Sequence, residues 1–515
     1  MEDTSFIITF LILIILPLFI AALLIKHISN NKLNLPPGPP AVPFIGNLLW
    51  LVIIFFRKPM SHAGSFLRPL KSRYGPIFSL RIRRHCSVFI ANHSLAHRAL
   101  VQNAAVFSDR PPPPPIVQMF NKTQRTVSTA AYGPTWRMLR RNLTGEILHP
   151  SRVKSYSGTR RRVVSSLVRK VFDEMPERDL GVGVMNHFQH ALFSLLSFMC
   201  FGDDLDDCQI KEVESIQRKT LLGFGPFSSF ALNIWPRVTK ILFRKRWEKL
   251  IQLRRDQEDV LFPLIRVRIE KRSEVMAYVD TLVDLQVKEG NMEFSEGELV
   301  NLCSEFLNGG SDTTATALQW IMANLVKHPR IQAKLYEEIS GVVGPPPNPS
   351  SSSLLLEVVK EEELQKMKYL KAVVLEALRL HPPSHFVLPH RVTEDVELDG
   401  YVVPKDSRVN FMVAEMGRDP EVWEDPMEFK PERFLEREGF DITGGKVIKM
   451  MPFGVGRRIC PGYALALLHL EYFIANLIWY FEWTRVEGEE IDFSEKQEFT
   501  TVMKNPLRAH ICPRF

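Results

Sequence analysis

The chain has 515 residues, of which 45% are hydrophobic, 24% charged and 10% aromatic, a composition that excludes a disordered, collagen-like or coiled-coil protein and allows a large core. Its 65 Lys and Arg residues exceed its 58 Asp and Glu residues, giving a formal net charge of +7. This mild excess suits an acidic partner or a membrane surface, and because no aromatic-interleaved basic cluster accompanies it, we expect no nucleic-acid partner.

The first predicted element is a transmembrane anchor over residues 1–25. From Phe6 to Ile25 the chain has twenty residues without a charge, which at helical rise span about 30 Å, enough to cross a bilayer core. Acidic residues precede this segment and Lys26 follows it, a pattern that favours an uncleaved anchor over a signal peptide. By the positive-inside rule, everything after the anchor should lie on the cytoplasmic side.

A basic and proline-rich linker is predicted over residues 26–45. Its Pro-Pro-Gly-Pro-Pro sequence at 36–40 cannot continue a helix and should form a stiff spacer. The apolar run Leu48 to Phe56 is too short to span a membrane, so it either dips into the membrane interface or packs in the core. Residues 46–515 contain no repeat and no long linker, and we expect them to form one large catalytic domain.

Within that domain helical patterns predominate over strand patterns. Ile77–Ile82 should pair with Ser87–Ala91, and Val396–Val403 should fold as a hairpin about Asp399-Gly400. The longest predicted helix runs from Ser295 to Lys327, where the Ser295/Glu298 spacing makes a capping box and His328-Pro329 ends the helix. A surface loop is expected over 344–353. The fold class is therefore mainly α with a small β part.

A glycine-rich loop near the C-terminus carries the clearest chemistry. Residues 453–462 read FGVGRRICPG and place Cys460 two residues after Arg458, just before the mostly apolar run that starts at Tyr463. Glycines at 456 and 462 would let the backbone turn tightly and approach a flat ligand, while Arg458 and the amides of a helix start would lower the thiol pKa. The alternative is a buried, inert cysteine.

This segment has the pattern FxxGxRxCxG and resembles the haem-ligand motif of the cytochrome P450 superfamily at all five fixed positions. Three other motifs of that family follow the family's order, namely Gly309-Gly310-Ser311-Asp312-Thr313-Thr314, Glu376-Ala377-Leu378-Arg379 and Pro431-Glu432-Arg433-Phe434. The resemblance covers the whole chain and is greatest to the plant microsomal class. It implies the cytochrome P450 fold, with a single haem domain behind an N-terminal transmembrane helix.

The resemblance also implies a haem site. Cys460 would be the iron ligand, and Trp136 and Arg140, four residues apart on one helical face, would bind haem propionates. The other implied cofactor contacts are Arg110, His390, Phe453, Gly456, Arg458 and Gly462. The neighbouring Arg137 and Arg141 either meet an acidic redox partner or are simply solvated.

The glycine pair in the long helix suggests a functional use. Gly309-Gly310 costs helix stability, and Thr313, four residues after Gly309, can hydrogen-bond the Gly309 carbonyl; a kink or a tight helix crossing is the alternative. By resemblance Asp312 and Thr313 form the acid-alcohol pair that relays protons during oxygen activation, with Thr314 the less favoured threonine.

Two further sets of residues take their meaning from the resemblance. Glu376 and Arg379 at i and i+3 indicate little alone, but by resemblance they form a buried charge network with Arg433. The proline run 111–115 is either a stiff lid over the substrate or a surface spacer. The segments implied to line the pocket are Gly223–Leu232, Phe306, Pro383–Leu388 and Thr500–Met503, several of them apolar, which favours a hydrophobic substrate.

The expected function is that of a membrane-anchored haem-thiolate monooxygenase that inserts one atom of O2 into a hydrophobic small molecule. Because no nucleotide-binding motif is evident, electrons from NADPH should arrive through a separate NADPH-cytochrome P450 reductase in the same membrane. We expect a single-pass protein of the endoplasmic reticulum membrane, in contact with membrane lipid, with its catalytic domain facing the cytoplasm. The alternatives are a haem-thiolate isomerase or dehydratase, and a non-catalytic membrane haem protein.

Overall fold

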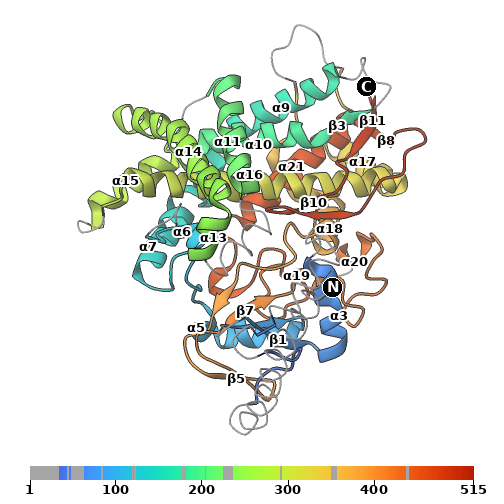
Figure 1. Cartoon of the computed structure of the whole chain (residues 1–515). Coiled ribbons are helices and arrows are strands. Elements are labelled where there is room, and N and C mark those ends of the chain that lie inside the picture. The colour runs from blue at the N-terminus through green and yellow to red at the C-terminus, as the bar shows by residue number, and fades with distance from the viewer. Residues whose placement is uncertain are drawn as a thin grey trace, which may run out of the picture. The chain divides into compact units, whose positions relative to one another are not determined.

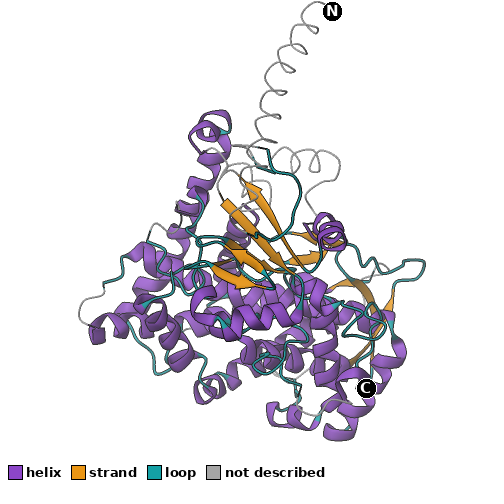
Figure 2. Ribbon diagram, turned by 90° about the horizontal axis from the view of Figure 1, so that it is seen from below, coloured by secondary structure: helices purple, strands orange, loops and turns teal. Residues whose placement is uncertain are grey.

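The structure is a computed structural model that describes residues 34–42, 46–47, 63–82, 85–118, 120, 123–174, 181–202, 205–223, 236–289, 293–348, 356–435 and 440–515. The chain forms two compact units. Unit 1 comprises Met1–Pro111, His385–Val422 and Asp441–Ile459, and unit 2 comprises Pro112–Ser384, Trp423–Phe440 and Cys460–Phe515. Helices predominate over strands, so the predicted class, mainly α with a small β part, is confirmed (Figure 2).

A mixed four-stranded sheet is the centre of unit 1, with strand order β1-β2-β7-β4. β1 and β2 are antiparallel, β2 and β7 are parallel, and β7 and β4 are antiparallel. Alternate strand residues such as Val88, Ile90, Val409 and Phe411 are fully buried in its core. The elements of unit 1 are β1 (Ile77–Ile82), β2 (His85–Ile90), β4 (His390–Arg391), β5 (Val396–Leu398), β6 (Tyr401–Val403), β7 (Arg408–Phe411), α3 (Ala63–Tyr74), α4 (His93–His97), α5 (Ala104–Phe107), α19 (Val413–Gly417), the π-helical turn η1 (Arg98–Gln102) and the 3-10 turn η5 (Gly456–Arg458).

Both strand pairs predicted from the sequence are present. β1 pairs with β2, which begins at His85 rather than at Ser87. β5 and β6 pair antiparallel with Leu398 opposite Tyr401. The two residues between them, Asp399 and Gly400, both have positive φ, 57° and 75°, as a two-residue hairpin turn requires.

The described part of the proline-rich linker is bound to unit 1. The amide of Ser79 in β1 donates to the Pro37 carbonyl at 2.7 Å, and the Ser79 hydroxyl donates to the Pro36 carbonyl at 2.8 Å. A side chain on Gly38 would lie 2.0 Å from the Ser79 carbonyl oxygen, so this contact requires glycine. The Asn47 side-chain amide also donates to the Pro39 and Pro40 carbonyls, each at 3.0 Å. The segment predicted as a spacer therefore docks against β1 and Asn47.

Unit 2 is built mainly of helices around α16, which Figure 1 shows beside α10 and α21. Their facing sides carry apolar residues with almost no exposure, for example Leu192, Leu318 and Phe473. The helices of unit 2 are α6 (Pro115–Gln118), α7 (Pro134–Asn142), α8 (Pro150–Ser155), α9 (Ser157–Asp173), α10 (Val184–Phe201), α11 (Asp207–Gly223), α13 (Pro236–Leu242), α14 (Arg244–Glu270), α15 (Tyr278–Glu289), α16 (Glu296–Lys327), α17 (Pro329–Val343), α18 (Lys368–Leu380), α20 (Glu432–Leu435), α21 (Tyr463–Tyr480), the π-helical turn η2 (Leu143–Ile147) and the 3-10 turn η4 (Glu361–Lys366).

The long helix begins and ends where the sequence predicts. α16 has 32 residues, with Ser295 as N-cap and Glu298 completing the capping box, and His328 follows its last residue. The carboxylate of Glu298 accepts from the Ser295 amide at 2.9 Å. These bonds satisfy amide groups that the first helical turn leaves without helical partners.

The strands of unit 2 lie in two small sheets. One has the order β3-β11-β8, from β3 (Val182–Gly183), β11 (Arg508–Pro513) and β8 (Phe481–Arg485). The other pairs β9 (Glu495–Gln497) with β10 (Thr501–Met503). The turn between β9 and β10 lies against α16.

Several predicted segments fall wholly or partly outside the described residues. The anchor and the run Leu48–Phe56 lie outside them, as do residues 224–235 and 349–355. Among the helices that the structure describes, none is both long enough and apolar enough to cross a membrane. The proline run 111–115 ends in α6, whose Ile116 packs with Ile216 and Trp247 of α11 and α14. The boundaries 1–25, 26–45 and 46–515 remain predictions.

Candidate functional site

Cys460 lies in unit 2 directly before α21. The thiol is half-buried, it accepts a hydrogen bond from the Gly462 amide, and the guanidinium of Arg140 in α7 acts on it electrostatically. Burial nevertheless raises the thiol pKa, because it outweighs the lowering by the Gly462 amide and by Arg140. The expected lowering of the pKa is therefore wrong in direction, since desolvation disfavours the thiolate more than these two groups favour it. The helix-start amide acts as predicted, and the cation beside the thiol is Arg140.

The loop that precedes Cys460 belongs to unit 1 and is held by close backbone contacts. Gly456 has φ +77°, and a side chain there would lie 2.2 Å from the Leu100 carbonyl oxygen, so the position requires glycine. Arg458 is buried and its Nε donates to the Ser108 carbonyl at 2.8 Å. Phe453 is half-buried in the same loop. Gly462, in unit 2, has open space on its Cβ side.

Trp136 and Arg140 both lie on α7, as their spacing predicts. Trp136 is buried, and its indole N–H donates to the Val127 carbonyl at 3.1 Å. Burial lowers the pKa of Arg140, an effect that the field of Cys460 opposes. The structure thus brings Arg140 to Cys460, whereas the indole N–H is directed to the backbone in front of its own helix.

Arg110 and His390 lie together in unit 1. Arg110 donates to the carbonyls of Leu388 and Pro389 at 2.7 and 2.9 Å. His390 is buried, and its Nδ1 lies 2.6 Å from the Phe107 carbonyl oxygen. Burial and then the positive field of Arg110 lower the His390 pKa to about 3, so the imidazole is neutral at pH 7. A neutral imidazole has one N–H, and the Phe107 carbonyl accepts it.

The two glycines of α16 have different surroundings. A side chain on Gly310 would lie 2.7 Å from Leu196 of α10, so this glycine permits a tight helix crossing. Gly309 is exposed and has open space on its Cβ side, although most of α16 around it is buried. Thr313 donates to the Gly309 carbonyl at 2.8 Å, as predicted. Gly309 and Thr313 therefore line an open face of the helix.

Asp312 lies next to this face and is hydrogen-bonded by Thr500, in the turn between β9 and β10. Its Oδ2 accepts a hydrogen bond from the Thr500 hydroxyl at 2.9 Å. Burial raises the Asp312 pKa, the Thr500 bond and Arg218 of α11 lower it, and Glu498 raises it. A carboxyl group with a raised pKa is a better proton carrier near neutral pH than an exposed one.

Glu305, which no sequence motif indicates, fixes the segment that leads to α7. Its two carboxylate oxygens accept the backbone amides of Val127 and Ser128, each at 2.8 Å. Val127 is also the acceptor of the Trp136 indole. The one sign of this role in the sequence is an acidic residue one turn before Gly309.

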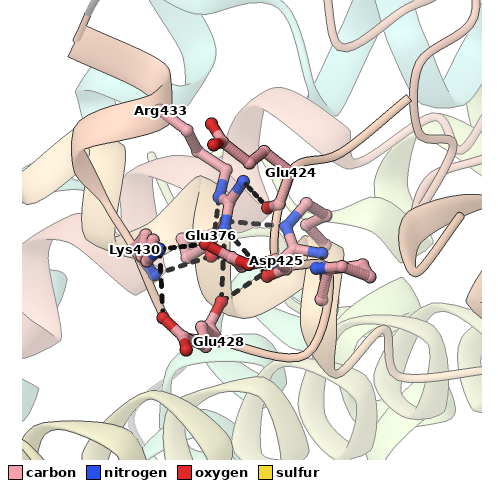
Figure 3. Close-up of polar contacts among 8 residues, drawn as sticks. Glu376, Glu424, Asp425, Glu428, Lys430 and Arg433 are labelled. Carbon is pink, nitrogen blue, oxygen red and sulfur yellow. Dashed lines mark hydrogen bonds and ion pairs between the residues drawn. The ribbon is translucent and has the colours of Figure 1, made fainter. Parts of the chain in front are cut away.

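The predicted network of Glu376, Arg379 and Arg433 is confirmed, and Figure 3 shows Glu376 beside Arg433 and Lys430. Glu376 and Arg379 are fully buried and form two bonds at 2.7 and 2.8 Å. Arg433 reaches Glu376 at 3.0 Å, and the Lys430 amide donates to the same carboxylate oxygen at 2.8 Å. The network joins α18 to residues 424–433, so its role is structural.

The residues of unit 2 fit a haem-thiolate site. A single half-buried thiol at the start of α21, with an amide donor and a cation beside it, is the donor set of a thiolate iron ligand. Gly462 and Gly309 each leave space where a side chain would stand, which suits a flat group close to the backbone. The remaining pocket segments are described in part: Phe306 is half-buried and stacks on Tyr278 with ring centroids 5.0 Å apart, and β10 contains Thr501–Met503.

Comparisons with known proteins show the family to which the chain belongs. A sequence model of the family Cytochrome P450 matches residues 36–513. Cytochrome P450 89A9 of Arabidopsis thaliana is 48% identical over 525 residues, covering 100% of both chains. Isoflavone 3'-hydroxylase of Medicago truncatula is 31% identical over 504 residues, covering 95% of this chain and 94% of that protein.

A solved structure shows the same fold. A zebra fish cytochrome P450 with progesterone superposes with a TM-score of 0.72 at 20% identity, covering 87% of this chain and 99% of that one. The sequence and fold agree with the predicted resemblance, including its placement among plant proteins. The family implies a haem cofactor, O2 and a small-molecule substrate. This chain therefore belongs to the cytochrome P450 family, and it is a P450 monooxygenase, an oxidoreductase.

Proposed function

We propose that this monooxygenase is anchored in the endoplasmic reticulum membrane by residues 1–25 and inserts one oxygen atom from O2 into a mainly hydrophobic small molecule. In the overall reaction a substrate RH, O2, NADPH and H⁺ give the product ROH, H2O and NADP⁺. A separate NADPH-cytochrome P450 reductase transfers the electrons. The observation that carries the proposal is Cys460 at the start of α21, hydrogen-bonded by the Gly462 amide and accompanied by Arg140.

Cys460 is the proposed iron ligand, and the haem that it holds supplies the chemistry of oxygen activation. The Gly462 amide and Arg140 stabilise the sulfur as a thiolate. Arg140, Arg110 and Arg458 are proposed to neutralise the haem propionates. Trp136 and His390 are uncharged and their N–H groups donate to the carbonyls of Val127 and Phe107, so they are proposed to contact the cofactor through their rings. Phe453, Gly456 and Gly462 are proposed to shape the loop on the cysteine side of the cofactor.

Thr313 and Asp312 are the proposed proton-handling groups. The Thr313 hydroxyl holds its proton on the Gly309 carbonyl, on the open face of α16, and can exchange this partner for a water or substrate. Asp312 lies at the adjacent position, with a pKa raised by burial. An acid and an alcohol placed so can supply protons to reacting oxygen and favour productive cleavage over release of peroxide.

Membrane contact has support from a described helix as well as from the anchor segment. Ile241 and Leu242 of α13 are 79% and 70% exposed, and Val238 is 51% exposed. Basic residues, Arg237 and Lys240, lie on the same short helix. Exposed apolar residues among cations are typical of a surface that rests on a lipid interface.

The substrate class is proposed from the pocket segments and from one relative. Phe306 places an aromatic ring in the region assigned to the pocket and stacks on the buried Tyr278, which suits a hydrophobic ligand. The 31% identical relative is named for hydroxylating isoflavones. An isoflavone is therefore the first substrate probe to test.

The test is reconstitution of the haem-loaded chain with a plant NADPH-cytochrome P450 reductase. We expect NADPH consumption that needs the reductase and O2, and an isotope label from ¹⁸O2 in the product of an accepted substrate. Turnover of an organic hydroperoxide without reductase or NADPH would identify an isomerase or dehydratase instead. A haem spectrum with neither activity would overturn the enzyme proposal in favour of a non-catalytic haem protein.

A further inference from the structure

One stripe of α16 is hydrogen-bonded to the turn between β9 and β10. Asp312, Thr316 and Trp320 are four residues apart and therefore lie on one helix face. Thr500 lies 2.9 Å from both Asp312 and Thr316, and the Trp320 indole donates to the Thr501 carbonyl at 2.9 Å. Thr500 and Thr316 are almost fully buried. The turn is thus fixed at the position of the proposed proton carrier.

The direction of these bonds follows from counting protons. An ionised carboxylate only accepts, so the Thr500 hydroxyl uses its single proton to donate to Asp312 Oδ2. The Thr500 oxygen then accepts the proton of Thr316. The chain runs from Thr316 through Thr500 to Asp312. Protonation of Asp312 can reverse it, with Asp312 donating to Thr500 and Thr500 to Thr316, so the chain stays satisfied in both states.

The other charged groups that act on Asp312 come from two elements. Arg218 of α11 favours the ionised carboxylate, and Glu498, in the same turn as Thr500, favours the protonated one. Burial favours the protonated form more strongly than either charge acts. Thr500 is the hydrogen-bond donor among these groups, and its removal would leave a buried carboxylate without that bond.

We propose that Thr500 is a positioning residue for oxygen activation, whose hydroxyl fixes the Asp312 carboxylate and links it to Thr316 in a reversible hydrogen-bonded chain. The inference rests on the proposed function, because it assumes that Asp312 handles protons during turnover. It adds to that function a residue 188 positions away in the sequence, in a segment otherwise assigned only to the pocket wall.

The experiment measures hydrogen peroxide formed per NADPH consumed, from pH 5.5 to 9, by the haem-loaded chain with reductase. It needs no substrate, because reduction of O2 to peroxide uses one NADPH and one proton while reduction to two waters uses two of each. In the wild type we expect the ratio of peroxide to NADPH to change with pH through an inflection, and we expect Asp312→Asn to lack this inflection. In Thr500→Val the inflection should move up by about one pH unit, since a lost hydrogen bond to a charged group destabilises the ionised form.

Two variants make the test specific to the hydroxyl. Thr500→Ser keeps the donor and should restore the wild-type profile. Thr220→Val is the matched control, because Thr220 is buried in α11 and its hydroxyl donates to the Ile216 carbonyl of its own helix at 2.8 Å. An unmoved inflection in Thr500→Val, an equal shift in Thr500→Ser or Thr220→Val, or a wild-type profile that Asp312→Asn leaves unchanged would each overturn the inference.

A double-mutant cycle of unfolding stability tests the hydrogen bond between Thr500 and Asp312 without requiring turnover. The urea midpoint shift of Thr500→Val combined with Asp312→Ala should be smaller than the sum of the two single shifts, because each substitution alone removes the same bond. Additive shifts would contradict the contact. If Thr500→Val no longer shows the carbon monoxide spectrum of the reduced protein, Thr500→Ala replaces it in both measurements.

The outcomes separate this inference from the proposed function. If the wild type with reductase does not oxidise NADPH, the proposed function itself is refuted. If the wild type turns over normally and the Thr500→Val pH profile does not move, this inference alone is refuted.

Discussion

The carboxylate of Glu376 balances two guanidinium groups in a fully buried position. Its replacement by alanine leaves Arg379 buried without a counter-charge, so Glu376→Ala should destabilise the fold by about 3 to 5 kcal/mol. Urea unfolding of the haem-loaded protein measures this loss. Glu248→Ala is the control, because Glu248 pairs with Arg244 on the surface, and its midpoint should barely move. Equal midpoints for the two variants would contradict a structural role for the network.

Thr313 presents its hydroxyl on the open face of α16. In Thr313→Ala the Gly309 carbonyl remains but the proton donor is lost, so more NADPH should end as hydrogen peroxide and less as product. Thr313→Ser should restore coupling. The measurement is the ratio of peroxide to NADPH in the reconstituted system. Unchanged coupling in Thr313→Ala would remove Thr313 from the proton path.

Residue properties that depend on neighbours one turn away could be predicted from the sequence, and those that depend on burial could not. The bond from Thr313 to the Gly309 carbonyl follows from a four-residue spacing. The pKa of Cys460 does not, because desolvation sums the effect of all surrounding atoms and here outweighs the nearby amide and cation. The partner of the Trp136 indole, the Val127 carbonyl, is likewise set by how the preceding segment folds back.

At the scale of an element, the start of α16 should respond to acid. Burial raises the pKa of Glu298, but hydrogen bonds from Thr123 and Ser295 and the field of Arg125 lower it overall below its ordinary value of 4.5. A lowered pKa means that the ionised group stabilises the fold above about pH 4.5 and that this contribution is lost as the pH falls through the folded-state pKa.

Glu298→Gln should therefore be less stable than the wild type at pH 7, and the difference should shrink below about pH 4.5. Denaturant midpoints measured from pH 7 to 3.5 check this. Glu296→Gln is the matched control, because Glu296 is exposed at the neighbouring position and pairs with Arg266 on the surface. A difference that persists unchanged at pH 3.5 would show that the Glu298 charge does not matter.

The elements that the sequence predicts best are those whose ends are set by residues close together in the sequence. The capping box fixes the start of α16, and Asp399-Gly400 fixes the turn between β5 and β6. The elements placed less well depend on partners far along the chain. β2 begins two residues earlier than predicted, because its pairing with β1 extends to His85 opposite Ile82. The proline-rich linker docks because Ser79 supplies donors to it.

At the scale of the whole molecule, the predicted topology can be tested in isolated membranes. If residues 1–25 form a single anchor with the positive side in the cytoplasm, protease added to intact microsomes should digest the catalytic part. Immunoblotting with antibodies against the C-terminal region follows the digestion. A luminal protein should stay protected in the same sample until detergent is added. Full protection of this chain before detergent would reverse the topology.

The family and the donor set could be predicted from sequence because each motif is short and contiguous. The way in which unit 2 completes the site could not. Arg140 reaches Cys460 across 320 positions of sequence, and Thr500 reaches Asp312 across 188. Contacts of this kind depend on the packing of α7, α16 and the β9–β10 turn, for which no local pattern exists. Glu305 escaped prediction for the same reason, since its partners are backbone amides of a distant loop.

Cys460 is proposed to bind haem iron as a thiolate, and the carbon monoxide difference spectrum of the reduced protein tests this assignment. The wild type should show a strongly red-shifted Soret band, Cys460→Ala should lose it, and Cys512→Ala, which changes an exposed cysteine in β11, should keep it. A band typical of nitrogen-ligated haem in the wild type, or a thiolate band that survives in Cys460→Ala, would contradict the assignment.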